Sequence, residues 1–353
     1  MDLGLSDEQH QLVDSFTNLL AKASTPEHVR AAEPGGVDQA LWRTLRETGA
    51  VTMGVAEAHG GWGATLVDLA LVAERLGRAV APAPVIEAQV AARLLAAIAS
   101  PAALDALGPV LAGERLVTLA VRPPQGGMAA LTPAGAVCDA VIVLDGDRLL
   151  LVPVSDRTRR PVANLAAAPL ADIDLSPSAI EGAAATELAA GVEAVDRFEA
   201  ALDEWLTLTA AALVGIGSAA LDLGCAYAAE RTAFGAPIGT FQGVSHPLAD
   251  DATHLDGARL LAQKAAWSLD RDDARGRELA AMAFAFASRT AEAATYDAIH
   301  VHGGYGFMLE YDVQLHHRRA RGWARVWGDA EAADARAADA RYAGARHTTT
   351  GAR

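Results

Sequence analysis

The chain reads as a helical sequence that is interrupted once, between residues 115 and 191, by short apolar runs of strand length. On both sides of this region, apolar side chains recur at the three- and four-residue spacing of a helix face. Aromatic residues make up only 5% of the 353 residues and alanine dominates, which favours tightly packed helices over an all-β fold. Helices, a small β unit and then helices again form an α+β order, and this is the fold class that we predict.

Residues 1–114 are predicted to form an N-terminal helical domain. Ser6 and Gln9 have the spacing of a capping box, and apolar residues follow them at helical spacing. A second helix is expected around residues 41–45, ending near Gly49. The glycine-dense segment 54–63 is interpreted as a turn that needs positive φ angles, because no apolar strand precedes it as in a dinucleotide-binding loop.

Residues 115–191 are predicted to form a shortened middle β domain. Three apolar runs, at residues 116–121, 140–144 and 149–154, are expected to be strands, and Asp145-Gly146-Asp147 between the last two is typical of a hairpin turn. Residues 192–353 are predicted to form a C-terminal four-helix bundle. Its helices are expected through residues 206–221 and over residues 241–269, 278–300 and 314–342.

Composition excludes several classes of function. The formal net charge of -15 makes a basic face for phosphate backbones improbable, so no nucleic-acid partner is expected. No apolar run reaches the roughly 18 residues that span a bilayer, and the acidic start has no signal-peptide pattern, so we expect a cytoplasmic protein without a membrane partner. Cys138 and Cys225 lack C-x-x-C spacing and are predicted to be buried small residues in a reducing compartment, with no metal site.

Two glycine-containing segments have the residue types that hold a phosphate ester. The first begins at Arg231 and reads R-T-A-F-G, ending at Gly235, and the second reads H-G-G-Y-G-F from His302 to Phe307. A guanidinium offers a fixed fork to a pyrophosphate, which a lysine does not match. Phe234 adds an apolar face and Gly235 permits a tight turn, while the two glycines of the second segment remove side chains where a ligand approaches.

Together with the glycine-dense segment 54–62 and the helix after it, these segments resemble the acyl-CoA dehydrogenase family, in order and across nearly the whole chain. The resemblance implies an FAD-dependent α,β-desaturation of an acyl-CoA thioester, with FAD held at a subunit interface. In this family one subunit holds the flavin ring, and its neighbour supplies the nucleotide-binding residues. The positions of this chain that match them are Arg231, Phe234, Gly235, Gln242, Gly303 and Gly304, and His300 stands where a glutamine is usual.

The chain departs from the family at the catalytic base, which is a carboxylate that removes the α-proton. The usual glutamate falls on Trp327, and the alternative position on the preceding long helix falls on Trp205. Glu204 is one residue away, which on a helix is a rotation of about 100°, so it needs a register shift to serve as the base. Glu310 resembles a structural acidic residue of the family.

The middle region departs as well. After Leu119, where the family has its flavin-contacting stretch, the chain reads A-V-R-P-P-Q-G-G. The basic run His316, His317, Arg318, Arg319 and Arg321 is interpreted as a solvated or intersubunit face.

These departures predict a partner subunit that lacks the base in a heteromeric acyl-CoA dehydrogenase, of the kind known in actinobacterial steroid degradation. A paralogous subunit would supply the base and the ring pocket in a heterotetramer, and an electron-transfer flavoprotein would take the electrons. One alternative is a complete homo-oligomeric dehydrogenase with a non-standard carboxylate base such as Glu204. The other is a non-enzymatic binding or assembly protein on the same scaffold. The sequence leaves the acyl group open.

Overall fold

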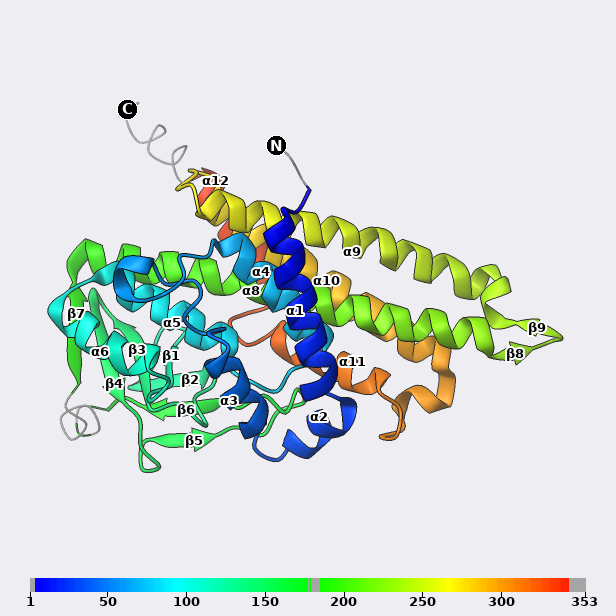
Figure 1. Ribbon diagram of the computed structural model, residues 1–353, viewed down its shortest axis with the longest axis horizontal. Coiled ribbons are helices and arrows are strands. Elements are labelled where there is room, and N and C mark those ends of the chain that lie inside the picture. The colour runs from blue at the N-terminus through cyan, green and yellow to red at the C-terminus, as the bar shows by residue number, and fades with distance from the viewer. Residues whose placement is uncertain (1–3, 177, 179–184, 343–353) are drawn as a thin grey trace, which may run out of the picture. The chain divides into compact units, whose positions relative to one another are not determined.

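The computed structural model describes residues 4–176, 178 and 185–342 (Figure 1). The chain forms two compact units. The bundle unit comprises Met1–Pro26, Leu66–Ala81 and Leu206–Arg353, and the sheet unit comprises Glu27–Thr65 and Pro82–Trp205. Helix α8, Gly191–Glu230, passes from the sheet unit into the bundle unit after Trp205. The predicted division into three domains at residues 115 and 192 stays a prediction.

The bundle unit is helical, as predicted. It contains α1 (Asp7–Ala23), α4 (Leu66–Arg78), most of α8, α9 (Gln242–Leu269), α10 (Gly276–His302), α11 (Val313–Trp323) and α12 (Ala330–Tyr342). The predicted capping box of α1 is present, because Ser6 and Gln9 each accept the other's backbone N–H through their side chains. The single helix predicted over residues 314–342 is wrong. It is broken between α11 and α12, where the Asp329 side chain accepts the Ala332 N–H and caps the new helix.

Glycines allow the long helices to approach closely. A Cβ built on Gly215 of α8 would lie 2.0 Å from the Glu74 carbonyl oxygen of α4, and one on Gly77 of α4 would lie 1.9 Å from the Ala212 carbonyl oxygen of α8. Further along α8, a Cβ on Gly217 would lie 2.7 Å from Leu255 of α9. The backbones of α4 and α8 are therefore in direct contact at this crossing, which a larger residue would separate.

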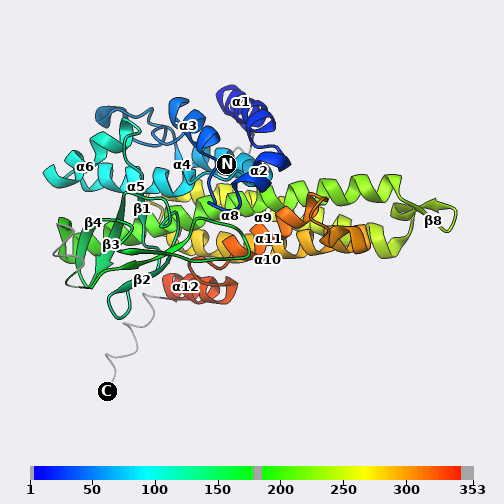
Figure 2. The ribbon, with the colours of Figure 1, turned by 90° about the horizontal axis from the view of Figure 1, so that it is seen from below.

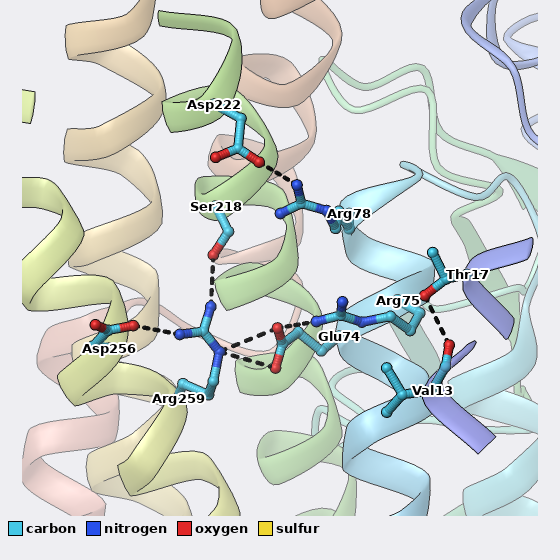
Figure 3. A network of polar contacts seen from close by, with 9 residues as sticks. All are labelled: Val13, Thr17, Glu74, Arg75, Arg78, Ser218, Asp222, Asp256 and Arg259. Atoms are coloured by element: carbon cyan, nitrogen blue, oxygen red, sulfur yellow. Dashed lines mark hydrogen bonds and ion pairs between the residues drawn. The ribbon is translucent and has the colours of Figure 1, made fainter. Parts of the chain in front are cut away.

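A buried carboxylate fastens α4 to the bundle beside this crossing (Figure 3). Glu74 is 5% exposed and accepts from Arg259 Nε of α9 at 3.2 and 3.3 Å, and it also pairs with Arg75. Arg259 in turn donates to Ser218 Oγ of α8 at 3.0 Å and to Asp256 at 2.5 Å. Burial of the Glu74 charge is tolerated because two guanidinium groups and their hydrogen bonds compensate it.

The sheet unit combines short helices with two small sheets. Its helices are α2 (Pro26–Ala32), α3 (Gln39–Glu47), α5 (Val85–Ile98) and α6 (Pro101–Leu111). One sheet has the order β1-β3-β4-β7, formed by Val117–Leu119, Ala140–Asp145, Arg148–Pro153 and Thr186–Ala190. The other has the order β2-β6-β5, formed by Met128–Thr132, Ala171–Asp174 and Arg159–Pro161. The apolar residues of both sheets share one buried cluster that includes Val141, Leu150 and Ile173.

The three predicted strands are present as β1, β3 and β4. The predicted hairpin turn is confirmed, because Asp145 pairs with Arg148 and Gly146 between them has φ 63°. Strands β2, β5, β6 and β7 were not predicted, because they have three to five residues and no long apolar run. The turn predicted in segment 54–63 is also confirmed, with φ 90° at Gly60 and 66° at Gly63.

The structure tests the prediction that both cysteines are buried. Cys138 is buried as expected, and its burial raises the pKa of the thiol to about 12. The prediction for Cys225 is wrong, because this thiol lies on an exposed face of α8. Among the described residues, α8 alone is long and apolar enough to cross a membrane, and 78% of its apolar stretch is buried inside the protein.

Candidate functional site

The R-T-A-F-G segment forms a two-stranded hairpin at one end of the bundle unit, between α8 and α9 (Figure 1). Strands β8 (Thr232–Ala233) and β9 (Ala236–Pro237) pair through Ala233 and Ala236, so that Phe234 and Gly235 form the turn. Both turn residues have positive φ angles, 53° and 85°, as a type I′ turn requires. The Arg231 backbone is fixed on both sides, because its N–H donates to Tyr227 O and its carbonyl oxygen accepts from Ile238 N, each at 2.8 Å.

The conformation and exposure of Phe234 reduce the stability of the isolated chain. A bulky residue with positive φ is strained, and the Phe234 side chain is 98% exposed. Its ring makes an edge-to-face approach to Phe241, with centroids 6.1 Å apart. The side chain therefore buries almost no surface here, and its position favours a contact with another molecule.

The H-G-G-Y-G-F segment lies at the same end of the bundle unit, at the carboxyl end of α10. His302 stacks on Tyr227 of α8 with ring centroids 4.4 Å apart, four residues before Arg231. A Cβ on Gly224 of α8 would lie 3.4 Å from Ala298 of α10, so the two helices are packed together at this end. Figure 2 confirms from a second side that α8, α9 and α10 run alongside one another towards this hairpin.

Different physical causes explain why glycine occupies each of three positions at the end of α10. Gly303 adopts φ 62° and ψ -135°, a conformation that only glycine takes easily. A Cβ on Gly306 would lie 2.6 Å from the Ile299 carbonyl oxygen, so glycine is required there by packing. Gly304 has neither reason, because its φ is ordinary and a Cβ would meet no atom within 4 Å. The absent side chain at Gly304 therefore leaves room for a partner from outside the chain.

The predicted nucleotide-binding residues are brought together at this end. We call the exposed surface there the hairpin face, and its residues are Arg231, Phe234, Gly235, Phe241, Gln242, Tyr296, His300, Gly303, Gly304, Tyr305 and Phe307. His300 stacks on Tyr296 of the same helix with centroids 6.3 Å apart. The Arg231 side chain is exposed and makes no hydrogen bond or ion pair with the described residues. An unpaired guanidinium, at the same end of the bundle unit as the open glycine backbone, fits the pyrophosphate of a dinucleotide.

Two aspartates with raised pKa values lie on α9 and α10. Asp251 of α9 is 4% exposed, and its Oδ2 has no hydrogen-bond partner among the described residues. Burial and the charge of Asp297 on α10 raise the pKa of Asp251 to about 6. Burial also raises the pKa of Asp297, although the nearby His300 opposes the shift. This part of the bundle therefore contains two carboxyl groups that disfavour simultaneous ionisation.

The structure places Glu204 and Trp205, the candidate and the alternative base position, in the sheet unit. Glu204 is held by Arg93 of α5, whose Nε and Nη2 donate to the two carboxylate oxygens at 2.8 Å each. Arg93 Nη1 donates to Gly54 O at 2.7 Å, which ties this pair to the glycine-dense segment. Glu204 is thus a structural ion pair, and Trp205 is 2% exposed.

A carboxylate that was not predicted lies beside Trp205. Glu87 stands in the first turn of α5 and is half-buried. Loss of solvent raises the pKa of its carboxyl group to about 6, although its own backbone N–H and a polar contact with Trp205 favour the ionised form. Sequence spacing gave no signal for this contact, because Glu87 and Trp205 lie on different helices.

The remaining base position, Trp327, lies between α11 and α12 and meets buried Phe284 edge-to-face, with centroids 6.1 Å apart. Trp327 therefore packs in an apolar contact at this position. The interpretation of the basic run in α11 as a solvated or intersubunit face is wrong for two of its members. His316 and Arg319 are buried, and burial lowers the pKa of His316.

Comparisons with known proteins match both ends of the chain. The family described as "Acyl-CoA dehydrogenase, N-terminal domain" matches residues 6–114, and "Acyl-CoA dehydrogenase, C-terminal domain" matches residues 196–339. The chain is 31% identical over 335 residues to acyl-CoA dehydrogenase IpdE2 of Mycolicibacterium smegmatis. That alignment covers 92% of this chain and 96% of the relative.

Two solved structures of the same fold have names that join two proteins. The Tcur3481-Tcur3483 steroid ACAD G363A variant has a TM-score of 0.86 and 26% identity, covering 96% of this chain and 99% of that chain. The ChsE4-ChsE5 complex from Mycobacterium tuberculosis has a TM-score of 0.86 and 24% identity, covering 98% and 99%. The predicted α+β fold, with helical ends around a small β region, is therefore confirmed.

Proposed function

The chain belongs to the acyl-CoA dehydrogenase family, and we propose that it is the partner subunit that holds the nucleotide end of FAD for a paralogous subunit. The family consists of oxidoreductases that act on CH–CH groups with FAD as cofactor. In the proposed heteromer the paralogue contributes the catalytic carboxylate and the pocket of the flavin ring. We place this activity in the cytoplasm, with an electron-transfer flavoprotein as acceptor.

The observation that carries this proposal is the outward orientation of the hairpin face. Phe234 is 98% exposed on a strained turn, and Arg231 beside it has no partner among the described residues. Features that cost stability and bury nothing in their own chain are typical of sites that bind a ligand or another subunit. The residues that match the family's nucleotide-binding positions thus face away from the core of their own chain.

The residues of this face would divide the work of holding the cofactor. Arg231 would place two parallel donors on the pyrophosphate, and the open backbone at Gly303 and Gly304 would let the nucleotide approach closely. Gln242 and His300 would supply further hydrogen bonds. FAD held there would supply the acceptor for the hydride that leaves the β-carbon of the thioester.

The base positions support a partner role. Trp205 and Trp327 replace both family carboxylates, and Arg93 holds Glu204 in a bidentate ion pair. The name of the Tcur3481-Tcur3483 steroid ACAD joins two chains, and this chain is 26% identical to one of them. By analogy alone, a heteromer and a steroid-derived acyl group are the form of the proposal that we favour.

Co-expression with a paralogous acyl-CoA dehydrogenase-like subunit from the same organism tests the proposal. The chain purified alone should be colourless and inactive, whereas the complex should carry the flavin absorption spectrum and bleach with an acyl-CoA. A yellow chain that bleaches by itself would refute the partner role. If the complex also stayed colourless and inactive, the chain would be a binding or assembly protein instead.

A second candidate function is a complete homo-oligomeric dehydrogenase with a non-standard base. Glu87 is the observation that favours it, because this half-buried carboxylate lies against Trp205 at an alternative base position. The same purification separates the two candidates, since only a complete dehydrogenase is yellow and active without a paralogue.

A further inference from the structure

We propose that a cavity of the sheet unit binds a small organic carboxylate with an apolar body, and that Arg46 holds its charged end. The cavity is formed by side chains of α3, α5, the end of α6 and the segment that leads into β1. The residues that line it differ from those of the hairpin face and from the base positions. The inference therefore concerns a second ligand site and goes beyond the role in holding FAD.

Two neighbouring cavities meet at Arg46. The first has a volume of about 120 Å³ and the second of about 230 Å³. The residues that line both of them are Arg46, Val51, Val110 and Gly113. An engineered apolar cavity of about 150 Å³ is large enough to bind benzene. Each side of Arg46 therefore has room for a ligand of about the size of a substituted benzene ring.

The first cavity has an apolar wall and a charged rim. Its apolar residues are Val37, Trp42, Val51, Pro84, Ala88, Val110, Leu116 and Val137. The rim includes the half-buried Arg115 and the exposed carboxylates Glu114 and Asp139. A largely apolar wall with a few placed polar groups is typical of sites for small molecules.

The Arg46 guanidinium is held in position by its own chain. Its Nη1 donates to Gly113 O, and its Cζ lies 5.6 Å from the centre of the Trp42 ring. Gly113 has φ 72°, a conformation that favours glycine, in the turn that follows α6. The guanidinium is therefore oriented before a ligand arrives, which reduces the entropy that binding would cost.

Two donor groups of Arg46 remain for a ligand. Nε is buried without a hydrogen-bond partner, and Nη2 makes no hydrogen bond with the described residues. These two nitrogens form the edge of a guanidinium that pairs side-on with the two oxygens of a carboxylate. A buried N–H without a partner destabilises the protein, and a bound carboxylate would satisfy it.

The charges around the cavities favour an anion. Arg43 lines the second cavity and Arg115 the first, and neither side chain makes a hydrogen bond or an ion pair with the described residues. Of the carboxylates on the rim, Asp139 accepts the Leu116 N–H at 2.7 Å and Glu47 is exposed to solvent. Three arginines therefore meet at these cavities although the whole chain has a formal net charge of -15.

The apolar wall selects the class of anion. One side-on pair of donors matches the two oxygens of a carboxylate. Inorganic phosphate carries further charged oxygens, which the Trp42 ring and the aliphatic side chains would leave without hydrogen bonds. The cavity is therefore expected to prefer carboxylates with an aromatic or branched aliphatic body.

Isothermal titration calorimetry and thermal unfolding of the purified full chain test the site. The ligands are benzoate, 3-phenylpropanoate and 3-methylbutanoate, and the controls are benzamide, acetate and inorganic phosphate. At least one of the three carboxylates should bind saturably and raise Tm as its concentration rises. Benzamide lacks the charge and acetate lacks the apolar body, so both should bind at least about tenfold more weakly than the best carboxylate.

Two variants locate the binding site. Arg46→Ala should weaken binding at least about tenfold, whereas Arg157→Ala, at an exposed arginine of the sheet unit, should bind as wild type does. Because Arg46 also ties α3 to Gly113, a second variant leaves the guanidinium in place. Ala88→Leu fills the cavity from α5 and should abolish binding in a chain that keeps the circular dichroism spectrum of wild type.

The result that would overturn the proposal is specific. It is a wild-type chain that binds none of the three carboxylates, or one that binds phosphate more tightly than all of them. Unchanged binding in folded Arg46→Ala or Ala88→Leu would overturn it as well. The measurements need neither flavin nor a paralogous subunit, so their outcome is independent of the partner role.

Discussion

Replacement of Asp251 by asparagine should stabilise the protein at neutral pH. Asp251 is 4% exposed, its Oδ2 has no hydrogen-bond partner among the described residues, and burial together with Asp297 raises its pKa from 3.8 to about 6. The folded protein therefore binds a proton more tightly than the unfolded chain. The stability that this group contributes is present below pH 3.8 and is lost as the pH rises through about 6.

The magnitude follows from the two pKa values. At pH 7.5 the ionised carboxylate costs the folded state about 3 kcal/mol, whereas at pH 4.5 it costs about 1 kcal/mol. Asparagine has nearly the same shape and carries no charge, so it should remove most of this cost. We expect Asp251→Asn to stabilise the fold by about 2 kcal/mol more at pH 7.5 than at pH 4.5.

Urea unfolding followed by circular dichroism at the two pH values measures this difference. Asp14→Asn is the matched control, because it makes the same change of charge at an exposed residue of α1. The control should shift the free energy of unfolding equally at both pH values. A stabilisation by Asp251→Asn that is independent of pH, or a destabilisation at pH 7.5, would refute the assignment of a destabilising buried charge.

Three further substitutions test the roles of individual glycines. Gly215→Ala should destabilise the bundle unit by about 2 kcal/mol or more in urea unfolding, because a Cβ there would lie 2.0 Å from the Glu74 carbonyl oxygen. Gly257→Ala in α9, where the nearest atom is 3.4 Å away, should instead stabilise by up to about 1 kcal/mol, and equal effects would contradict the close crossing. Gly304→Leu should leave the stability of the isolated chain unchanged, since its Cβ meets nothing within 4 Å, but should reduce flavin retention in the complex. Unfolding of the Gly304→Leu chain by itself would show that the glycine serves its own fold.

Sequence reasoning succeeded where the signal is local. The apolar periodicity of α9 and α10 predicts their bounds to within two residues, and the Asp-Gly-Asp turn predicts the β3–β4 pairing. It failed where a short irregular stretch decides the outcome. Residues 324–329 interrupt an otherwise helical stretch between α11 and α12. The Asp329 side chain caps the second helix and so fixes where α12 begins.

In the candidate site, too, residues that are close in sequence were predicted and contacts between distant residues were not. The residues of the hairpin face were found because they follow one another in two short motifs. The pairing of Glu204 with Arg93 and the contact of Glu87 with Trp205 depend on how α5 packs against α8, and the residues are 111 and 118 positions apart in the chain. Cys225 was misplaced for a related reason, since an apolar helix does not reveal which of its small residues face outward.

Flavin retention by the Arg231→Ala complex tests the central proposal most directly. The complex with the paralogous subunit is purified for wild type, Arg231→Ala and Arg157→Ala, the last an exposed arginine in the sheet unit. FAD dissociation is measured by flavin fluorescence, and unfolding of each complex is followed in parallel. Loss of a bidentate pyrophosphate contact should weaken FAD binding at least about tenfold with little change in unfolding, whereas Arg157→Ala should retain FAD. An Arg231→Ala complex that keeps its FAD as tightly as wild type would contradict the account.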